Sequence, residues 1–393
     1  MQRRRGIASL LSGLLMLTTA TVIGGASAVA GSKVTASGET ASSASVIGVV
    51  RLVSAGFGVV EASPVSSPGT ISRPRLLATS SSGGHFNEIG PRLPPFTLID
   101  DVSFLDRDHG WLVAWNLTNV GVTVYRTRDG GRTWQGRAVT THTQNAGAVA
   151  TVQFLNPRRG WLVSQEPTAP RARLYSSSDG GANWRLVNDR LPEIAPVVFA
   201  SADDAWQAGG FFSRFLFHSV DGGNIWTRAQ LPVPASERSA KAMYGPPVFF
   251  GHTILAPVTF LHPGAAHQAV YRSGDDGRSW RLASLLKVTG ATAPGGNCAV
   301  FPAPLPISLE SARTWWVGGL RAGGWFAYRT TNAGRSWEPN LIAHAKPSPN
   351  CPRSELQAID TRTAWFTFLA GTNDRELYAT SDAGKHWRRI RPS

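Results

Sequence analysis

Acidic side chains are the residues of this sequence whose type could do chemistry, because two carboxylates facing each other across a sugar can cleave a glycosidic bond. Five aspartates recur in one repeated motif, and seven more lie in or near expected turns. Turn acids commonly accept hydrogen bonds from backbone amides, so we expect a structural role for them, while a catalytic pair among them stays open. The seven are Asp100, Asp101, Asp106, Asp108, Asp203, Asp204 and Asp360.

The positions of the tyrosines argue against a sialidase, which needs a tyrosine nucleophile. Five of the six tyrosines lie nine residues before a repeated aromatic residue, where two other repeats carry Phe217 and Leu77. The hydroxyl group is therefore dispensable at that position. Only Tyr244 lies outside the repeat. A general glycan-active hydrolase remains the enzymatic alternative.

Histidines gather in the fifth repeat, but their spacing matches no helical or ribbon metal motif. They are His252, His262 and His267. We expect surface or core histidines there, and no metal site. The glycine-rich stretches lack the strand, loop and helix that together hold a phosphate group, so we also expect no cofactor.

The elements that position these residues follow from a repeat. Six stretches such as LYSSSDGGANW (174–184) share one frame, and a seventh, LLATSSSGGHF, ends at Phe86 with Ser81 in the acidic position. Their last aromatic residues lie 42 to 57 residues apart, a period typical of propeller blades. The acidic and aromatic box residues of the six full copies are Asp129 and Trp134, Asp179 and Trp184, Asp221 and Trp226, Asp275 and Trp280, Asn332 and Trp337, and Asp382 and Trp387.

A second marker precedes the boxes. In five repeats an aliphatic residue lies nine positions before a tryptophan, as Val102 before Trp111 and Val152 before Trp161. The first residues of this stretch alternate with the two-residue period of a half-buried strand. Each unit predicts four strands, and seven units predict an all-β fold: a seven-bladed β-propeller of four-stranded antiparallel blades over residues 46–393.

The box is explained by the requirements of a tight turn. Glycine supplies the positive φ that such turns need, and Ser177 and Asp179 can accept hydrogen bonds from turn amides. The ring of Trp184 is expected to pack against the sheet. At ~25 cal/mol per Å², a buried ring of ~150–250 Å² contributes roughly 4–6 kcal/mol, so stabilisation is a sufficient reason for the motif.

Five boxes match the Asp-box pattern Ser/Thr-x-Asp-x-Gly-x-x-Trp in full, and Asn332 and Ser81 mark the two departures. This motif occurs in sialidases, other glycosidases, sortilin-type receptors and non-enzymatic assembly factors. Together with strands such as HGWLVAW, it most resembles the photosystem II assembly and stability factor family and its relatives in non-photosynthetic bacteria, over about residues 46–390. The resemblance implies structural boxes in a non-catalytic scaffold that binds a partner.

The first 30 residues have the layout of a secretory signal peptide. Three arginines at positions 3–5 precede an apolar run that ends in Ala-Val-Ala at 28–30, a cleavage site. An uncleaved anchor is the alternative. We interpret residues 31–45, which are rich in Ser, Ala, Gly and Thr, as a linker or tether, or as an outer strand that fastens the ring. No membrane span is expected after cleavage.

The two cysteines suit an exported chain with one disulfide bond. Cys298 and Cys351 lie in connections that lead from a fourth strand to the next blade, in adjacent blades. A disulfide between them is therefore geometrically reasonable. Zinc is not expected, because isolated cysteines lack its close ligand pairs.

The formal net charge of +14 favours anionic partners. One cluster of arginines could bind carboxylates or phosphates bidentately, and dispersed solubilising arginines are the alternative. The cluster comprises Arg158 and Arg159, after an inner strand, and Arg171 and Arg173, between the next two strands of the same blade. We expect a protein partner with acidic groups, leave a glycan open, and expect no nucleic acid.

The sequence thus predicts an exported, monomeric propeller that binds a protein as an assembly scaffold in the cell envelope or outside the cell. A glycan-active hydrolase that uses the central face of the ring is the alternative. Two acids facing each other across the channel, beside inward arginines, would favour that alternative.

Overall fold

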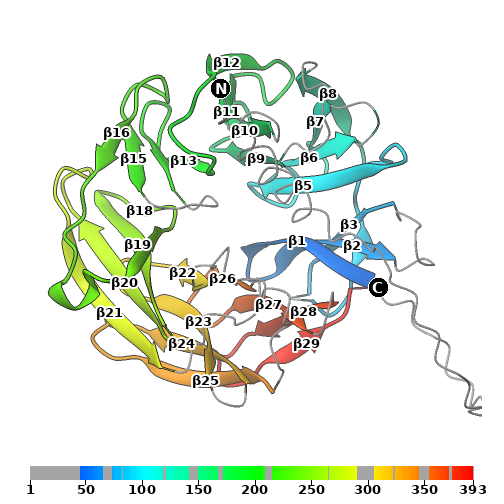
Figure 1. Cartoon of the computed structure of the whole chain (residues 1–393). Helices are drawn as coiled ribbons and strands as arrows, with labels where there is room; N and C mark the ends of the chain where they lie inside the picture. Colours follow the sequence, from blue (N-terminus) through cyan, green and yellow to red (C-terminus); the bar gives the residue numbers. More distant parts are fainter. Residues whose placement is uncertain are drawn as a thin grey trace, which may run out of the picture.

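Seven antiparallel sheets stand round a central axis as the blades of a propeller (Figure 1). The computed structural model describes residues 45–64, 73–81, 83–116, 118, 121–140, 149–166, 171–208, 215–263, 265–289, 305–321, 324–344, 354–370 and 374–392. The predicted fold class is confirmed. The predicted signal peptide lies outside the described residues, and so does the predicted linker except for its last residue.

Within every blade the strands follow the chain from the inner to the outer edge of the sheet. Blades 1 to 4 comprise β1 (Ser45–Ser54), β2 (Phe57–Pro64), β3 (Arg75–Thr79) and β4 (Asn87–Glu88); β5 (Thr97–Phe104), β6 (Gly110–Asn116), β7 (Gly121–Thr127) and β8 (Gln135–Thr140); β9 (Val149–Phe154), β10 (Gly160–Glu166), β11 (Arg171–Ser177) and β12 (Arg185–Asn188); and β13 (Val197–Phe199), β14 (Ala205–Gln207), β15 (Leu216–Ser219) and β16 (Thr227–Ala229).

The second half of the chain continues in the same order after a short 3-10 helix, η1 (Ala235–Glu237). Among the described residues, no helix has the length and apolar character to cross a lipid bilayer. Blades 5 to 7 comprise β17 (Lys241–Tyr244), β18 (Val248–Phe250), β19 (Thr253–His262), β20 (Ala265–Ser273) and β21 (Arg281–Thr289); β22 (Ile307–Leu309), β23 (Trp315–Arg321), β24 (Gly324–Thr330) and β25 (Glu338–Ala343); and β26 (Ser354–Ala358), β27 (Ala364–Ala370), β28 (Asp374–Thr380) and β29 (Arg388–Ile390).

Blade 5 has a fifth strand because its inner strand is interrupted. Both β17 and β18 pair with β19, the first near its end and the second near its start. Pro246 and Pro247 lie between them, and proline has no backbone N–H to donate to a ladder. The two short strands therefore occupy the place of one inner strand.

The core lies between the blades, where most residues of the second strands are buried. Trp111 on β6 stacks on Phe154 of the next blade, with ring centroids 3.7 Å apart, and its indole N–H donates to Gly180 O at 3.0 Å. The same stack recurs one blade later between Trp161 and Phe199. These aromatic pairs tie each blade to the next.

The seven box turns share one pattern of hydrogen bonds. In the box of blade 3, Gly181 N donates to Ser177 Oγ at 2.8 Å and Asn183 N donates to Asp179 Oδ1 at 2.9 Å. In blade 1 the hydroxyl of Ser81 replaces the acid and accepts from His85 N at 2.9 Å. The ring of Trp184 is half-buried and meets Phe154 edge-on. We call the face of the ring that carries these turns the box face.

Side chains join neighbouring inner strands, each of which is the inner edge of its own sheet. Gln153 on β9 accepts from Phe199 N at 2.8 Å and donates to Phe199 O at 3.1 Å. Ser308 makes the same pair of bonds with the backbone of Ala358. These contacts satisfy backbone groups that an unpaired strand edge would leave open.

The ring closes between blades 1 and 7, each built from consecutive strands, without a shared sheet. Gln357 on β26 accepts from Leu52 N at 2.8 Å and donates to Val50 O at 2.7 Å. Beside them, Trp365 and Ile390 of blade 7 are buried with Val60 of blade 1 in one apolar cluster. Closure therefore depends on side-chain packing and on side-chain hydrogen bonds, among them these two of Gln357.

Candidate functional site

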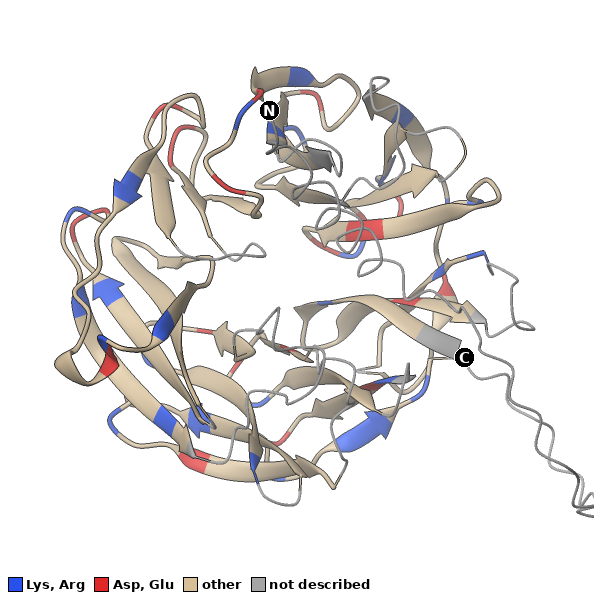
Figure 2. Ribbon diagram, viewed as in Figure 1, with Lys and Arg blue, Asp and Glu red and all other residues tan. Residues whose placement is uncertain are grey.

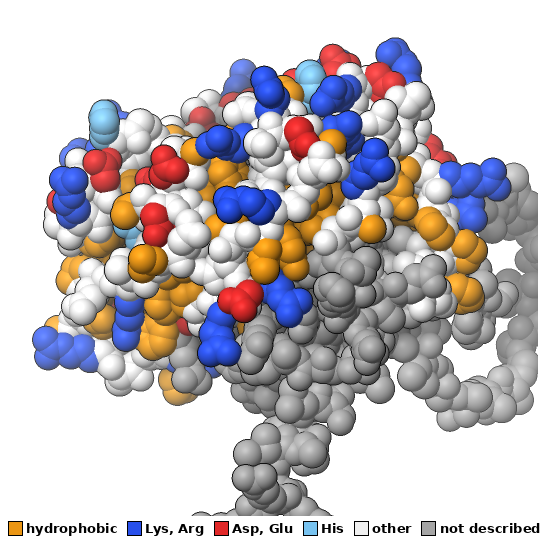
Figure 3. Space-filling model, turned by 90° about the horizontal axis from the view of Figure 1, so that it is seen from above, with side chains coloured by type: hydrophobic (Ala, Val, Ile, Leu, Met, Phe, Trp, Pro, Cys, Tyr) orange, Lys and Arg blue, Asp and Glu red, His pale blue; other side chains and the backbone are white. Residues whose placement is uncertain are grey.

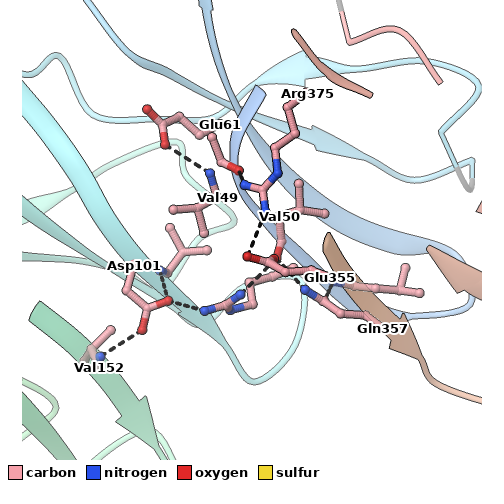
Figure 4. Close-up of polar contacts among 12 residues, drawn as sticks. Val49, Val50, Glu61, Asp101, Val152, Glu355, Gln357 and Arg375 are labelled. Atoms are coloured by element: carbon pink, nitrogen blue, oxygen red, sulfur yellow. Dashed lines mark hydrogen bonds and ion pairs between the residues drawn. The ribbon is translucent and has the colours of Figure 1, made fainter. Parts of the chain in front are cut away.

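A group of charged side chains from blades 7, 1 and 2 lies beside the inner strands of these blades (Figure 4), and we call it the channel cluster. Arg51 on β1 forms an ion pair with Asp101 on β5. Asp101 is 5% exposed, and it accepts from Val102 N at 2.9 Å through Oδ1 and from Val152 N at 3.0 Å through Oδ2. Both of its carboxylate oxygens are therefore engaged, one of them with the next inner strand.

Glu61 lies on β2 behind the inner strand of blade 1. Burial raises the pKa of Glu61 to about 7, against the hydrogen bond from Val49 N and the charge of Arg375, which lower it. Position 48 must be glycine for this carboxyl to fit, since a Cβ there would lie 2.1 Å from Glu61 Oε2. Glu61 is thus enclosed by the backbone of β1.

Asp100 and Arg375 complete the group. Burial raises the pKa of Asp100 well above its ordinary value, although Ala150 N donates to its Oδ2 at 3.2 Å. Arg375 on β28 pairs with Glu355 at 2.8 Å and donates to Gly48 O. Each of these side chains joins one blade to its neighbour.

The chemistry open to this cluster is limited by its hydrogen bonds. A glycosidase needs two carboxylates on opposite sides of a substrate. The acids here come from three adjacent blades, and Asp101, Asp100 and Glu61 each accept a hydrogen bond from a backbone amide of an inner strand. This arrangement cross-links inner strands and is not the arrangement that would favour a hydrolase.

Sequence reasoning missed Arg51, Glu61, Glu355 and Arg375 as members of a cluster. The sequence feature that could have indicated the cluster is a charged residue within an apolar strand, such as Glu61 between Val60 and Ala62. The box acids are also no candidates for proton transfer. Hydrogen bonds from the Thr133 hydroxyl and amide lower the pKa of Asp129 to about 2, so it stays ionised.

The structure separates the two pairs of predicted anion-binding arginines. Arg158 and Arg159 are exposed in the turn between β9 and β10, on the box face, where Arg158 O accepts from Gly180 N at 2.7 Å. Arg173 lies on β11 opposite Ser164, four residues along β10 from its start, or ~13 Å away at ~3.3 Å per residue. Arg171 lies two residues further along the ladder, opposite Glu166, and its side chain is outside the described residues.

A pocket of about 400 Å³ lies beside Arg159, between blades 3 and 4 on the box face. Its wall includes Arg185, Asp203 and the box residues Asp179 and Asp221. Four of the seven exposed large hydrophobic residues of the described chain belong to blade 3 and the box of blade 4. They are Leu155, Leu186, Val220 and Ile225. Leu186 lies between Arg185 and Val187, which line the pocket, so its side chain is on the opposite face of β12. We call the pocket with Arg158, Arg159, Arg185, Leu155, Val220 and Ile225 the blade 3–4 surface.

Basic residues are spread round the whole ring, as Figure 2 shows, so the net charge is not confined to one blade. Seen from above, Lys and Arg alternate with acidic side chains, and apolar side chains are exposed between them (Figure 3). Charge alone therefore does not mark the blade 3–4 surface. What sets it apart is the combination of a pocket, exposed apolar residues and three arginines.

Two of the three histidines of the fifth repeat come together with an acid from η1. His262 Nε2 lies 2.7 Å from Glu237 Oε2, and His267 Nδ1 lies 3.1 Å from both oxygens of Glu237. His252 lies apart, with its side chain 96% exposed. The proposed disulfide partners Cys298 and Cys351 lie outside the described residues.

Comparison with known proteins supports the resemblance carried by the boxes. Residues 91–193, which form blades 2 and 3, match the family model described as Photosynthesis system II assembly factor YCF48. The Photosystem II assembly protein Ycf48 of Thermosynechococcus vestitus is 48% identical over 48 residues. That match spans only 12% of this chain and 12% of the relative.

Two solved structures are similar to this chain. An ulvan lyase, from a new polysaccharide lyase family, is 9% identical, and the alignment covers 88% of this chain and 96% of that one with a TM-score of 0.52. At this identity the likeness to the lyase concerns the fold alone. A structure described as YCF48 bound to D1 peptide is 18% identical over 75% of this chain and 93% of that one, with a TM-score of 0.32.

Proposed function

We propose that this protein is an exported, non-catalytic scaffold that binds a protein partner in the cell envelope or outside the cell. The observation that carries the proposal is the match of blades 2 and 3 to the assembly-factor model. The relative that is identical at nearly half of the 48 aligned positions is itself named an assembly protein. A partner-binding role for this chain, as a monomer, is the simplest function consistent with both.

The blade 3–4 surface is the part of the scaffold that we assign to the partner. Its arginines can each hold a carboxylate through two parallel hydrogen bonds, and its exposed leucine, valine and isoleucine side chains offer apolar contact. The pocket between the blades can receive a side chain from the partner. An acidic protein segment with apolar residues fits this chemistry, whereas a neutral glycan would not use the arginines as ion-pair partners.

The proposal that the protein is not a catalyst is supported by the hydrogen bonds of the acids in the channel cluster. Asp101 and Asp100 bind amides of the next inner strand, and Glu61 binds an amide of β1. Two pockets formed by described residues, between blades 3 and 4 and beside Trp315, contain none of these acids. Similarity of fold to a polysaccharide lyase does not supply the missing site.

The test is a crosslinked pull-down from the cell envelope of the source organism, with a matched control. The variant Arg158→Glu/Arg159→Glu reverses the charge of the turn between β9 and β10. The control, Arg313→Glu/Arg362→Glu, makes the same change in the corresponding turns of blades 6 and 7, where both arginines are also exposed and both carbonyls also accept from a box amide.

We expect one protein at a stoichiometric level with the wild type and the control, and its loss with the Arg158/Arg159 variant. Capture should weaken as salt rises, because exposed ion pairs are screened. Equal capture by both variants would refute the surface. Recovery of glycan without protein would refute the scaffold itself and direct the next experiment to glycoside turnover.

A further inference from the structure

The cluster of Glu237, His262 and His267 is a set of metal-ligand groups that the proposed function does not use. Their nitrogen and carboxylate oxygen atoms all lie within 4.8 Å of one another. Two imidazoles and one carboxylate are a ligand set that zinc commonly takes with a water molecule in the fourth position. The cluster therefore has both the donor atoms and the convergence of a metal site.

Each ligand is held by a different element. Glu237 ends η1, where its amide donates to Pro234 O at 2.9 Å and its carbonyl accepts from Ala240 N at 3.0 Å. His262 and His267 lie on the paired strands β19 and β20. His267 pairs with Phe260, two residues before His262, so both histidines point to the same face of the sheet. Their ring centroids are 4.6 Å apart.

The carboxylate is the buried member of the set. The side chain of Glu237 is 0% exposed, and Ser236 Oγ donates to its Oε1 at 2.9 Å. A second-layer hydrogen bond of this kind orients a ligating carboxylate. The histidine side chains are 21% and 15% exposed, which leaves a path from solvent to their nitrogens.

The distances suit an ion of the size of Zn²⁺. Metal-to-ligand distances of ~2.0–2.1 Å in a tetrahedron place the ligand atoms ~3.3 Å apart. The present separations between Glu237 oxygens and the histidine nitrogens are 2.7 Å and 3.1 Å. The two histidine nitrogens lie within 4.8 Å of each other, so the three groups need only converge on the ion, which would replace the protons now shared by them.

We propose that Glu237, His262 and His267 bind one Zn²⁺ ion, which fastens the connection from blade 4 to the β19–β20 hairpin of blade 5. The site is independent of the blade 3–4 surface. Blade 5 has a reason to need such a fastening, because its inner strand is interrupted and it lacks the second-strand tryptophan of the other full repeats.

The experiment uses the full chain purified without a histidine tag and dialysed against a chelator. Zinc is then titrated by calorimetry, and bound metal is measured by mass spectrometry. The variant is His262→Gln/His267→Gln, whose amides can still donate to Glu237 but are poor zinc ligands. The control is His252→Gln, which changes an exposed histidine in the same blade.

We expect one zinc ion per chain for the wild type and the control, and at least ~100-fold weaker binding for the double variant. Bound zinc should also raise the melting temperature of the wild type and not that of the double variant. Wild-type uptake no greater than that of the double variant would overturn the proposal, and so would loss of zinc from the His252 control.

A second readout keeps the test decisive if the double variant fails to fold. Co²⁺ added to the metal-free wild type should give the intense visible absorption of a four- or five-coordinate ion. Only the weak absorption of an octahedral, aquo-like ion would overturn the site without use of any variant.

Discussion

The buried carboxyl of Glu61 makes the stability of the ring depend on pH. Its folded-state pKa of about 7 exceeds the ordinary value of 4.5 because burial disfavours the charged form. A raised pKa on an acid means that the folded state holds the proton more tightly than the unfolded state. The stability it contributes is therefore fully present below pH 4.5 and is lost as the pH rises to about 7.

The size of the effect follows from the shift. At 1.36 kcal/mol per unit of pKa, a rise from 4.5 to about 7 corresponds to about 3 kcal/mol. The substitution Glu61→Gln keeps the shape and the acceptor for Val49 N but cannot ionise. We expect the variant to be more stable than the wild type by about 3 kcal/mol at pH 8 and to differ little from it at pH 4.5.

The assay is denaturant unfolding of both proteins across pH 4.5 to 8. Asp100 is present in both proteins, and burial is the main cause of its raised pKa; the smaller part that comes from the charge of Glu61 is absent from the variant and adds to the difference in the same direction. Glu88→Gln, on the exposed β4 of the same blade, is the matched control and should follow the wild-type profile. Parallel profiles for the wild type and Glu61→Gln would refute the reasoning.

Two further predictions concern the box turns and the closure of the ring. Ala383 has a φ of +69° at a position where three other boxes carry glycine, so Ala383→Gly should raise the free energy of unfolding by about 1 kcal/mol, whereas Ala182→Gly, in a box position without positive φ, should not. Measured loss of stability in Ala383→Gly would contradict this. Gln357→Ala removes both hydrogen bonds of this amide across the closure of the ring, and denaturation should show a loss of about 2 kcal/mol or more, as for Gln153→Ala in the equivalent bridge; unchanged stability would show that these two bonds are not needed to hold blades 1 and 7 together.

The fold could be predicted from the sequence because its information is local. Each box, such as Ser177 to Trp184, contains its turn glycines, its amide acceptor and its packing aromatic within eight residues. Seven repeats of that unit leave few architectures other than a propeller. The split of the inner strand of blade 5 was harder to predict, although Pro246 and Pro247 indicate an interruption there.

The channel cluster and the way the ring closes could not be predicted from a single sequence. Arg51 and Asp101 are 50 residues apart, and Gln357 and Leu52 are 305 apart. Their contacts depend on which side chain of an inner strand points toward the next strand, and one residue of register reverses that direction. No local pattern encodes such a register between sheets that share no backbone ladder.

The positions at which blades differ are the place to look for function in this ring. A residue that recurs in most blades, such as a box acid, serves a requirement that the blades share, and its hydrogen bonds account for it. A residue found in one blade cannot be explained that way. The turn between the first two strands carries two arginines in blade 3, Arg158 and Arg159, but only one in blades 6 and 7. His262 and His267 occur on the hairpin of blade 5 and in no other blade. The two experiments on those residues therefore test two of the places where the chain departs from its own repeat.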